Sequence, residues 1–198
     1  MMVKRKQAAK SKAGRLRIVA GNWRSRLLDI ADVAGLRPTS ERIRETLFNW
    51  LAPTIHGARC LDLYAGTGAL GLEALSRGAA STVFVERSAV AARQLTDNVN
   101  LLGAGGASVH QQDALDFLRD SSGQDFDIVF LDPPFAADLL QETCRLLAEK
   151  KLLADGAQVY LEQDRSRPEP ALPDGWQIKK NKTAGMVRYM LALAGEGD

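Results

Sequence analysis

The most constraining feature of the chain is an apolar run at 126–131 that ends in Asp132-Pro133-Pro134-Phe135. Such a run predicts a strand of a parallel sheet that is buried on both faces. The two prolines cannot continue the sheet, because each lacks an N–H and has a fixed φ. The chain must leave the strand rigidly at its carboxyl end, where open α/β sheets bind ligands. An acid, a stiff turn with carbonyl groups and an aromatic ring together form a candidate clamp for a planar, amine-bearing group, although an acidic strand end before a proline turn is the plainer interpretation.

From residue 58 onward, segments typical of strands alternate with segments typical of helices. Repeated strand–helix units predict a parallel, doubly wound α/β sheet with right-handed crossovers. The length of 198 residues suits one domain with a small extension. We expect a disordered basic tail at 1–13, an N-terminal hairpin and helix at 14–53, and the main domain at 54–198. The predicted strands are 59–65, 81–86, 107–112, 126–131 and 157–162, the helices lie near 69–77, 89–102, 114–119 and 139–150, and a terminal hairpin joins 176–182 to 186–193.

A glycine-rich turn follows the first of these strands and completes the pattern G-x-G-x-x-G at Gly71. An acid, Glu86, stands twenty residues beyond Gly66, where dinucleotide-binding folds hold ribose hydroxyls. The pattern does not separate a nicotinamide cofactor from S-adenosylmethionine, because both contain an adenosine ribose. The candidate cofactor-binding residues are Asp62, Ala65, Gly66, Thr67, Gly68, Glu86, Arg87, Asp113 and Ala114.

Two acids around this turn have alternative interpretations. Asp62, four residues before Gly66, would attract the ammonium group of a methionine moiety and repel a pyrophosphate. The alternative role for Asp62 is a structural acid bonded to the glycine turn. Asp113 would either accept a hydrogen bond from an adenine amino group or cap the helix that follows it. Both alternatives stay open at this point.

Charge is unevenly distributed along the chain. Residues 1–45 contain 12 Lys or Arg and 4 Asp or Glu, whereas residues 46–198 contain 14 and 20. Clustered cations bind phosphates with release of counterions, so a nucleic acid is the expected partner. We predict a basic hairpin that carries an aromatic side chain near its tip, then a helix capped by Thr39 or Ser40 whose cations remain for solvent or phosphate. The candidate RNA-contacting residues are Arg15, Arg17, Trp23, Arg24, Arg26, Arg37, Arg42 and Arg44.

Several classes of protein are disfavoured. No apolar stretch approaches the roughly 18 residues that would span a membrane. Cys60 and Cys144 lack the spacing of a zinc site and read as buried thiols of a reducing compartment, and His56 and His110 are isolated. We therefore expect a protein of a reducing compartment with no metal site and no membrane partner. We also expect a monomer, although the sequence does not fix the oligomeric state.

The two central motifs combine with three N-terminal ones. These are Arg17-Ile18-Val19-Ala20-Gly21, Leu36-Arg37-Pro38-Thr39 and Arg44-Glu45-Thr46-Leu47-Phe48-Asn49-Trp50-Leu51. Together with the glycine turn and Asp132-Pro133-Pro134-Phe135, they resemble the RsmD family of bacterial methyltransferases, which act on N2 of one guanine in small-subunit (16S) ribosomal RNA.

This resemblance implies the class I (Rossmann-like) methyltransferase fold: a mostly parallel seven-stranded sheet with helices on both faces, extended by the N-terminal hairpin and helix. It implies S-adenosylmethionine as methyl donor, 16S rRNA within the assembled small ribosomal subunit as partner, and a cytoplasmic location. It also implies that the helix after Arg37-Pro38-Thr39 borders the donor site and that the hairpin contacts RNA. Asp132, Pro133, Pro134 and Phe135 would be the catalytic residues.

Three other functions stay open on the motifs alone. The first is methylation of another amine, such as adenine N6 in DNA or RNA, since the amine clamp would be the same. The second is an NAD-dependent oxidoreductase that uses the glycine turn. The third is a non-catalytic RNA-binding module that has kept a nucleotide fold, which the retention of both the acids and the tetrapeptide disfavours.

Overall fold

The computed structural model describes residues 14–33, 35–36, 38–123, 125–134 and 137–195. The predicted tail at 1–13, Arg37 and Phe135 lie outside the described residues.

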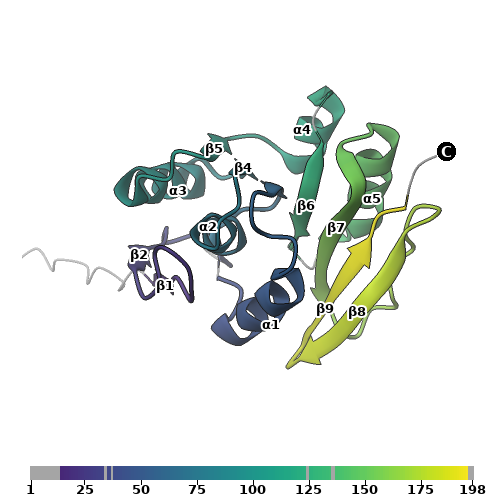
Figure 1. The fold of residues 1–198 in the computed structure, drawn as a ribbon, viewed down its shortest axis with the longest axis horizontal. Helices are drawn as coiled ribbons and strands as arrows, with labels where there is room; N and C mark the ends of the chain where they lie inside the picture. The colour runs from purple at the N-terminus through teal and green to yellow at the C-terminus, as the bar shows by residue number, and fades with distance from the viewer. Residues whose placement is uncertain (1–13, 34, 37, 124, 135–136, 196–198) are drawn as a thin grey trace, which may run out of the picture.

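One seven-stranded sheet forms the centre of the molecule, in the order β5-β4-β3-β6-β7-β9-β8 (Figure 1). Every pairing from β5 to β7 is parallel, and β9 and β8 complete the sheet as antiparallel strands. The strand order reverses between β3 and β6, which is where such sheets bind ligands. The strands are β3 (Arg59–Asp62), β4 (Ser81–Val85), β5 (Ala107–His110), β6 (Phe126–Leu131), β7 (Leu153–Asp164), β8 (Gln177–Ala184) and β9 (Val187–Leu193).

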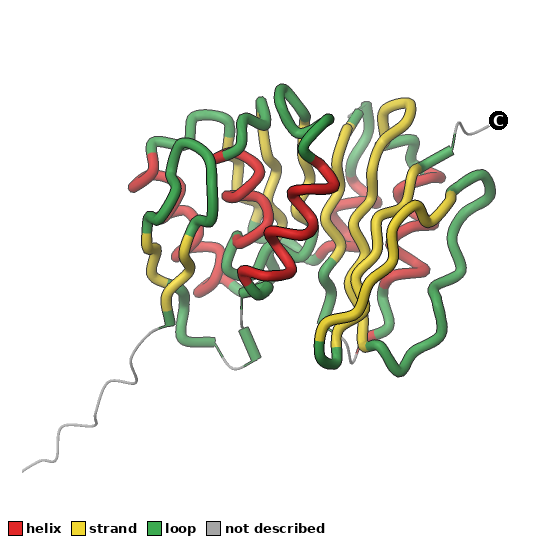
Figure 2. The backbone as a smooth tube through the Cα atoms, turned by 60° about the horizontal axis from the view of Figure 1, so that its bottom comes forward, coloured by secondary structure: helices red, strands yellow, loops and turns green. Residues whose placement is uncertain are grey.

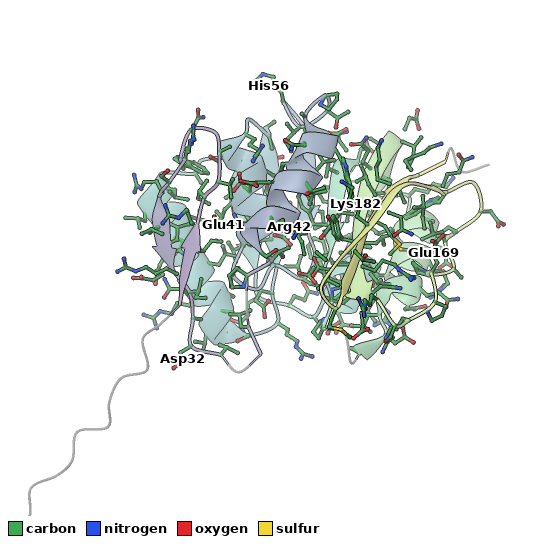
Figure 3. The ribbon with its side chains drawn as sticks, turned by 90° about the horizontal axis from the view of Figure 1, so that it is seen from below. Asp32, Glu41, Arg42, His56, Glu169 and Lys182 are labelled. Carbon is green, nitrogen blue, oxygen red and sulfur yellow. The ribbon has the colours of Figure 1, made fainter. Side chains whose placement is uncertain are left out.

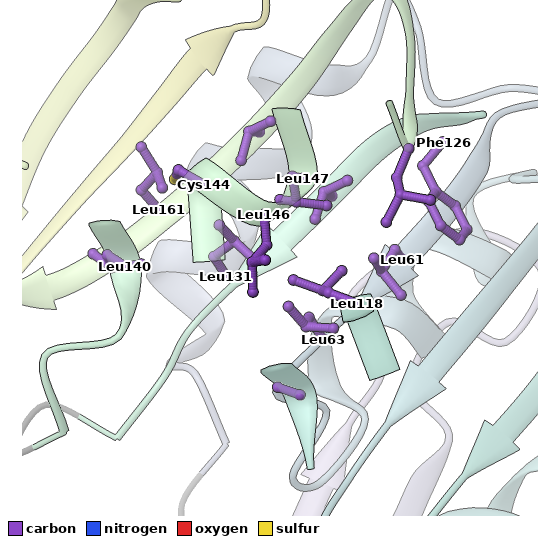
Figure 4. Close-up of a cluster of buried hydrophobic side chains, with 14 of the residues drawn as sticks. Leu61, Leu63, Leu118, Phe126, Leu131, Leu140, Cys144, Leu146, Leu147 and Leu161 are labelled. Atoms are coloured by element: carbon purple, nitrogen blue, oxygen red, sulfur yellow. The ribbon is translucent and has the colours of Figure 1, made fainter. Parts of the chain in front are cut away.

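Helices cover both faces of the sheet, as predicted (Figure 2). The helices are α1 (Glu41–Leu51), α2 (Ala69–Ser76), α3 (Ala89–Leu102), α4 (Ala114–Asp120) and α5 (Leu140–Glu149). Alternation along β6 builds the two cores: Val129 and Leu131 pack with α4 and α5 (Figure 4), whereas Ile128 and Phe130 pack with α1 and α2.

Each strand and helix predicted from residue 58 onward is present, and β7 differs most from its predicted bounds. It begins at Leu153 rather than 157, because Leu153 already pairs with Phe126 before the register shifts. Gly156, with a φ of 69°, lies in this irregular stretch. A local pattern of apolar residues does not show such a bulge, since the bulge depends on the partner strand.

The N-terminal hairpin consists of β1 (Arg15–Arg17) and β2 (Leu27–Asp29) and is docked on the body of the protein. Its apolar side chains share a core cluster with α2, α3 and β4. Its tip is fixed to the end of α2, where the backbone N–H of Asn22 donates to the Ser76 carbonyl (2.7 Å) and that of Trp23 donates to Ser76 Oγ (3.0 Å). Gly21, with a φ of 82°, passes so close that a Cβ there would lie 1.8 Å from the Ser76 carbonyl oxygen.

A buried carboxylate, Glu73 of α2, joins the hairpin to two helices. It accepts hydrogen bonds from the backbone N–H groups of Val19 (2.8 Å) and Ala20 (2.9 Å). It also accepts from Nη1 of Arg44 on α1 (3.0 Å) and Nε of Arg77 (2.8 Å). The four donors satisfy a charge that is fully removed from solvent.

The prediction that Arg44 remains for solvent or phosphate is wrong. The residue is 1% exposed, and the other nitrogens of its side chain donate to the carbonyls of Thr39 (3.1 Å) and Arg17 (2.8 Å). Burial lowers the pKa of the Arg44 guanidinium, and the charge of Glu73 opposes that shift. The physical reason is that Glu73, buried on the neighbouring helix, requires a cation at this position.

We expect Glu73→Gln to destabilise the fold by about 3–5 kcal/mol, because it leaves the Arg44 cation buried without its anion. Chemical denaturation followed by circular dichroism measures the change. Glu142→Gln, which removes the acid of an exposed ion pair with Arg145, is the control and should change the midpoint little. Equal midpoints for Glu73→Gln and the control would show that the buried ion pair does not hold the hairpin in place.

Candidate active site

The glycine turn and Asp132 leave neighbouring strands at the same edge of the sheet. Asp62 of β3 is paired with Phe130 of β6, and the backbone N–H of Leu63 donates to the Phe130 carbonyl (3.2 Å). Because the strands are parallel, both chains then run out at their carboxyl ends. The register therefore brings the turn at 66–68 and the start of the proline turn to one edge, as the sequence predicted.

The glycines have the conformations that the sequence pattern requires. Gly66 and Gly68 have φ values of 53° and 77°, in the left-handed region that favours glycine. Gly71 lets α2 lie against the sheet, since a Cβ there would lie 2.2 Å from Cε1 of Phe84. Ala65 and Thr67 are buried within the turn.

Three predicted acids, Asp62, Glu86 and Asp132, lie around this turn. Asp62 is 3% exposed and accepts from the backbone N–H of Gly71 (2.9 Å), which is the structural bond considered above. Glu86 accepts from the backbone N–H groups of Gly66 (2.8 Å) and Ser88 (2.7 Å). Burial, together with the negative charges of Asp132 and Glu86, raises the pKa of Asp62 to about 7, although the hydrogen bond from Gly71 opposes this shift. The carboxyl groups gathered at this edge favour a cationic ligand over a pyrophosphate, because a cation would stabilise their ionised forms.

The remaining predicted cofactor residues lie at the ends of β4 and β5. Arg87 is exposed, and Ala114 is the first residue of α4. Asp113 caps α4 by accepting from the backbone N–H groups of Leu115 (2.9 Å) and Asp116 (3.4 Å). Both bonds use Oδ1, so the cap leaves Oδ2 for a further donor.

The segment before α1 borders both halves of the site. Thr39 Oγ1 donates to Oδ2 of Asp132 (3.1 Å), and Leu36 lies so near the glycine turn that its Cδ1 would be 2.9 Å from a Cβ on Gly66. Ser40, one of the two predicted caps, accepts from the backbone N–H of Ile43 and starts α1. Sequence reasoning placed this helix beside the donor site but did not identify the bond between Thr39 and Asp132.

Glu162 is a site residue that sequence reasoning missed. Leu131 pairs with Leu161, so the next residues, Asp132 and Glu162, are neighbours at the ends of β6 and β7. Glu162 is 5% exposed and accepts from the Tyr160 hydroxyl (2.6 Å). The signal was present in the predicted strand 157–162, which ends in an acid after a buried run.

The carboxyl groups of Asp132 and Glu162 affect each other's protonation. Burial raises the pKa of Asp132 to about 6. Burial and the charge of Asp132 raise the pKa of Glu162 to about 8. Near neutral pH the pair therefore retains about one proton, which the two carboxyl groups share. Glu162 also lines a depression beside Pro133 and Pro134.

The predicted RNA-contacting residues do not share one environment. Arg15 pairs with Asp29 (3.5 Å) and Arg17 with Glu41 (3.7 Å). The two arginine side chains nevertheless remain 64% and 50% exposed. Trp23 is half-buried against the core below the hairpin. Arg24, Arg26 and Arg42 are exposed.

Within the described part of the chain, no group of three or more His, Cys, Asp or Glu side chains is arranged to hold a metal ion. None of the described helices has the length and apolar character needed to cross a membrane. Cys60 and Cys144 are buried free thiols, as predicted.

Comparisons with known proteins agree with this geometry. The model of a protein family described as "Conserved hypothetical protein 95" matches residues 16–193. Ribosomal RNA small subunit methyltransferase D of Escherichia coli K12 is 48% identical over 181 residues, which cover 91% of this chain and 91% of that protein. The protein of the same name from Haemophilus influenzae is 45% identical over 90% of this chain and 93% of its own length. The chain belongs to the RsmD family. It is a methyltransferase, and the resemblance inferred from its motifs is confirmed.

Solved structures show the same fold for this RsmD-family chain. The yhhF structure from Escherichia coli superposes with a TM-score of 0.86 at 44% identity and covers 92% of this chain and 99% of that one. An RNA methyltransferase from Salinibacter ruber, solved in complex with S-adenosyl-L-homocysteine, has a TM-score of 0.63 at 16% identity, covering 82% of this chain and 96% of that one. At that identity the likeness shows the fold alone.

The acid pair of this RsmD-family enzyme gives an expected pH dependence of stability. The folded-state pKa of Glu162, about 8, lies above its ordinary value of 4.5, so between these values the folded protein binds more protons than the unfolded chain. The stability that neutral Glu162 contributes is therefore fully present below its ordinary pKa of 4.5. It is lost as the pH rises through the folded-state pKa of about 8. Glu162→Gln stays neutral, so its melting temperature should match that of the wild type in acid and exceed it increasingly toward about pH 8. A difference in melting temperature between Glu162→Gln and the wild type that stays constant from acid to about pH 8 would show that Glu162 does not hold a proton in the folded protein.

Proposed function

We propose that this chain transfers a methyl group from S-adenosylmethionine to the exocyclic N2 of one guanine in 16S rRNA, within the assembled small ribosomal subunit. That substrate places the enzyme in the cytoplasm, where we propose that it acts as a monomer. The observation that carries the proposal is the position of Asp132, beside the glycine turn on the neighbouring parallel strand.

The residues around the turn fit this methyl donor. S-adenosylmethionine supplies an electrophilic methyl group on a positively charged sulfonium, and the three acids form an electronegative edge that suits such a cation. We assign Glu86 to the ribose hydroxyls and Asp62 to the side of the methionine ammonium. We assign Asp113 and the backbone of Ala114 to the adenine. The same acids oppose the pyrophosphate of a nicotinamide dinucleotide, which argues against an oxidoreductase.

The chemistry assigned to Asp132 is the orientation of a weak nucleophile. The lone pair of guanine N2 is conjugated with the ring, so the amine must be held until this pair points at the methyl carbon. Asp132 accepts one N–H of the amine and the Pro133 carbonyl accepts the second, while Phe135, by resemblance, stacks on the base. Such alignment is worth up to about 7–11 kcal/mol in intramolecular reactions. The base must be extruded or unpaired to enter.

Two neighbours keep Asp132 ready for this task. The Thr39 hydroxyl bonds to Oδ2 and thereby fixes the orientation of the carboxylate. Glu162 shares a proton with Asp132, so the pair keeps a negative charge near neutral pH with which Asp132 would accept the amine N–H. Asp132 need not be a strong base, because the amine becomes acidic once it is methylated.

The proposal is tested by incubating the protein with labelled S-adenosylmethionine and small ribosomal subunits that lack the modification, with free RNA alongside. Digestion should recover the label as N2-methylguanosine at a single position of 16S rRNA. Label in N6-methyladenosine would assign the same amine clamp to a different base. Absence of label from every nucleic acid would overturn the proposed substrate.

Asp132→Asn should lower turnover by at least about 100-fold, because a misplaced amine alone costs that much. The donor should still bind within a few-fold, since the amide keeps an oxygen for Thr39. Single-turnover methylation measures the first quantity, and calorimetry with S-adenosylhomocysteine measures the second. Methylation at the wild-type rate would remove Asp132 from the catalytic residues.

Glu86→Gln should weaken binding of S-adenosylhomocysteine by about 10- to 100-fold, as expected for lost hydrogen bonds to a charged group. The substitution also removes an acceptor for the Gly66 or Ser88 N–H, so melting temperature is recorded with affinity. Asp97→Asn, an exposed acid on α3, is the matched control. An unchanged dissociation constant for Glu86→Gln would exclude Glu86 from the donor site.

A further inference from the structure

The sheet register places four side chains in one row, from the proposed catalytic acid to the edge of the sheet. Asp132, the residue after β6, neighbours Glu162 of β7. Glu162 pairs with Tyr189 of β9, and Tyr189 pairs with Lys182 of β8. Since β8 is the edge strand, Lys182 ends the row. Three strand spacings separate its ends, about 14 Å along the sheet.

The row lies on the face of the sheet that α1 covers. Trp50 of α1 stacks on Tyr189, with ring centroids 5.5 Å apart and planes 23° from parallel. The Lys182 ammonium lies 5.8 Å from the centroid of the same Trp50 ring, so this lysine is held beside α1 rather than directed away from it.

A second lysine, Lys180, ends the neighbouring row of paired residues, which begins at Phe130 instead of Asp132. Phe130 pairs with Tyr160, Tyr160 with Leu191, and Leu191 with Lys180. Lys180 and Lys182 are two residues apart on β8 and therefore point to the same face. Both are exposed.

These cations are not neutralised by acids. Among the described residues, no ion pair within 4.0 Å joins Lys180, Lys182 or Arg42 to an acid. Arg42 stands in the first turn of α1, and Figure 3 shows it on the same lower face as Lys182. The face thus offers positive charge close to an otherwise acidic edge.

We propose that Lys180 and Lys182, with Arg42, bind backbone phosphates of the RNA strand adjoining the target nucleotide. The inference rests on the proposed function and assigns a second RNA contact to it. The docked hairpin lies on one side of α1 and β8 on the other (Figure 1). Cations on both sides of the acidic edge would hold the RNA strand across it. The carboxylates themselves repel phosphate, so only the base would enter between them.

Lysines on an edge strand have a second use, since they prevent the edge from pairing with another chain. The two roles respond differently to substitution. Edge protection needs a charge of either sign, so Lys180→Glu/Lys182→Glu preserves it. Phosphate binding needs a positive charge, so the same double variant abolishes it.

The test compares this double variant with Lys150→Glu/Lys151→Glu, which makes the same change in net charge between α5 and β7, at the amino end of β7 and thus at the opposite end of that strand from Glu162. Binding to unmodified small subunits is titrated over a range of salt concentrations, and KM and kcat for methylation are measured. S-adenosylhomocysteine affinity reports on the integrity of the donor site. Lys180→Gln/Lys182→Gln, which is neutral, is measured in parallel.

We expect the β8 glutamate variant to bind subunits at least about 10-fold more weakly, with a log–log salt slope shallower by at least about 1.4, as for two lost phosphate contacts. KM should rise and kcat at saturation should change little, with donor affinity unchanged and the glutamine variant intermediate. Binding and a salt slope equal to those of the wild type, or an equal loss in the Lys150/Lys151 variant, would overturn the proposal. Failure of the wild type itself to methylate subunits would instead refute the proposed function.

Discussion

The parallel pairing of β3 with β6 is the constraint on which the site depends. Because Asp62 is in register with Phe130, the turn that follows β3 and the acid that follows β6 leave the sheet side by side. A shift by one residue would turn every side chain of β6 to the opposite face. Neither Ile128 and Phe130 nor Val129 and Leu131 could then keep their cores, so burial on both faces fixes the position of Asp132.

The same burial makes the site costly to fold. Asp62, Asp132 and Glu162 all have pKa values raised by desolvation, so their ionisation opposes the folded state at neutral pH. A core built for stability alone would place apolar side chains at these strand ends. The acids are instead gathered at one edge, where a cationic ligand would relieve their repulsion. Acids that destabilise the fold in this way are typical of functional sites, which is why they indicate where the site lies.

Local patterns in the sequence predicted the elements but not the contacts between distant ones. Apolar runs, glycine turns and the Ser40 cap depend on neighbours in the chain, and each was recognisable. The pairing of Arg44 with Glu73 joins residues 29 positions apart, and the bond from Thr39 to Asp132 spans 93. An arginine on an amphipathic helix therefore read as an exposed cation, because nothing near it in sequence revealed the buried acid of α2.

These long-range contacts form a continuous path from the hairpin to the active site. Glu73 binds the hairpin backbone at Val19 and also the Arg44 guanidinium. Arg44 in turn donates to the Thr39 carbonyl, and the Thr39 hydroxyl donates to Asp132. The hairpin therefore has two roles in this fold: it presents cations to solvent, and its docking holds the segment that orients the acid. A buried ion pair contributes little net stability in general, and here its value lies in fixing one arrangement of three elements around Asp132.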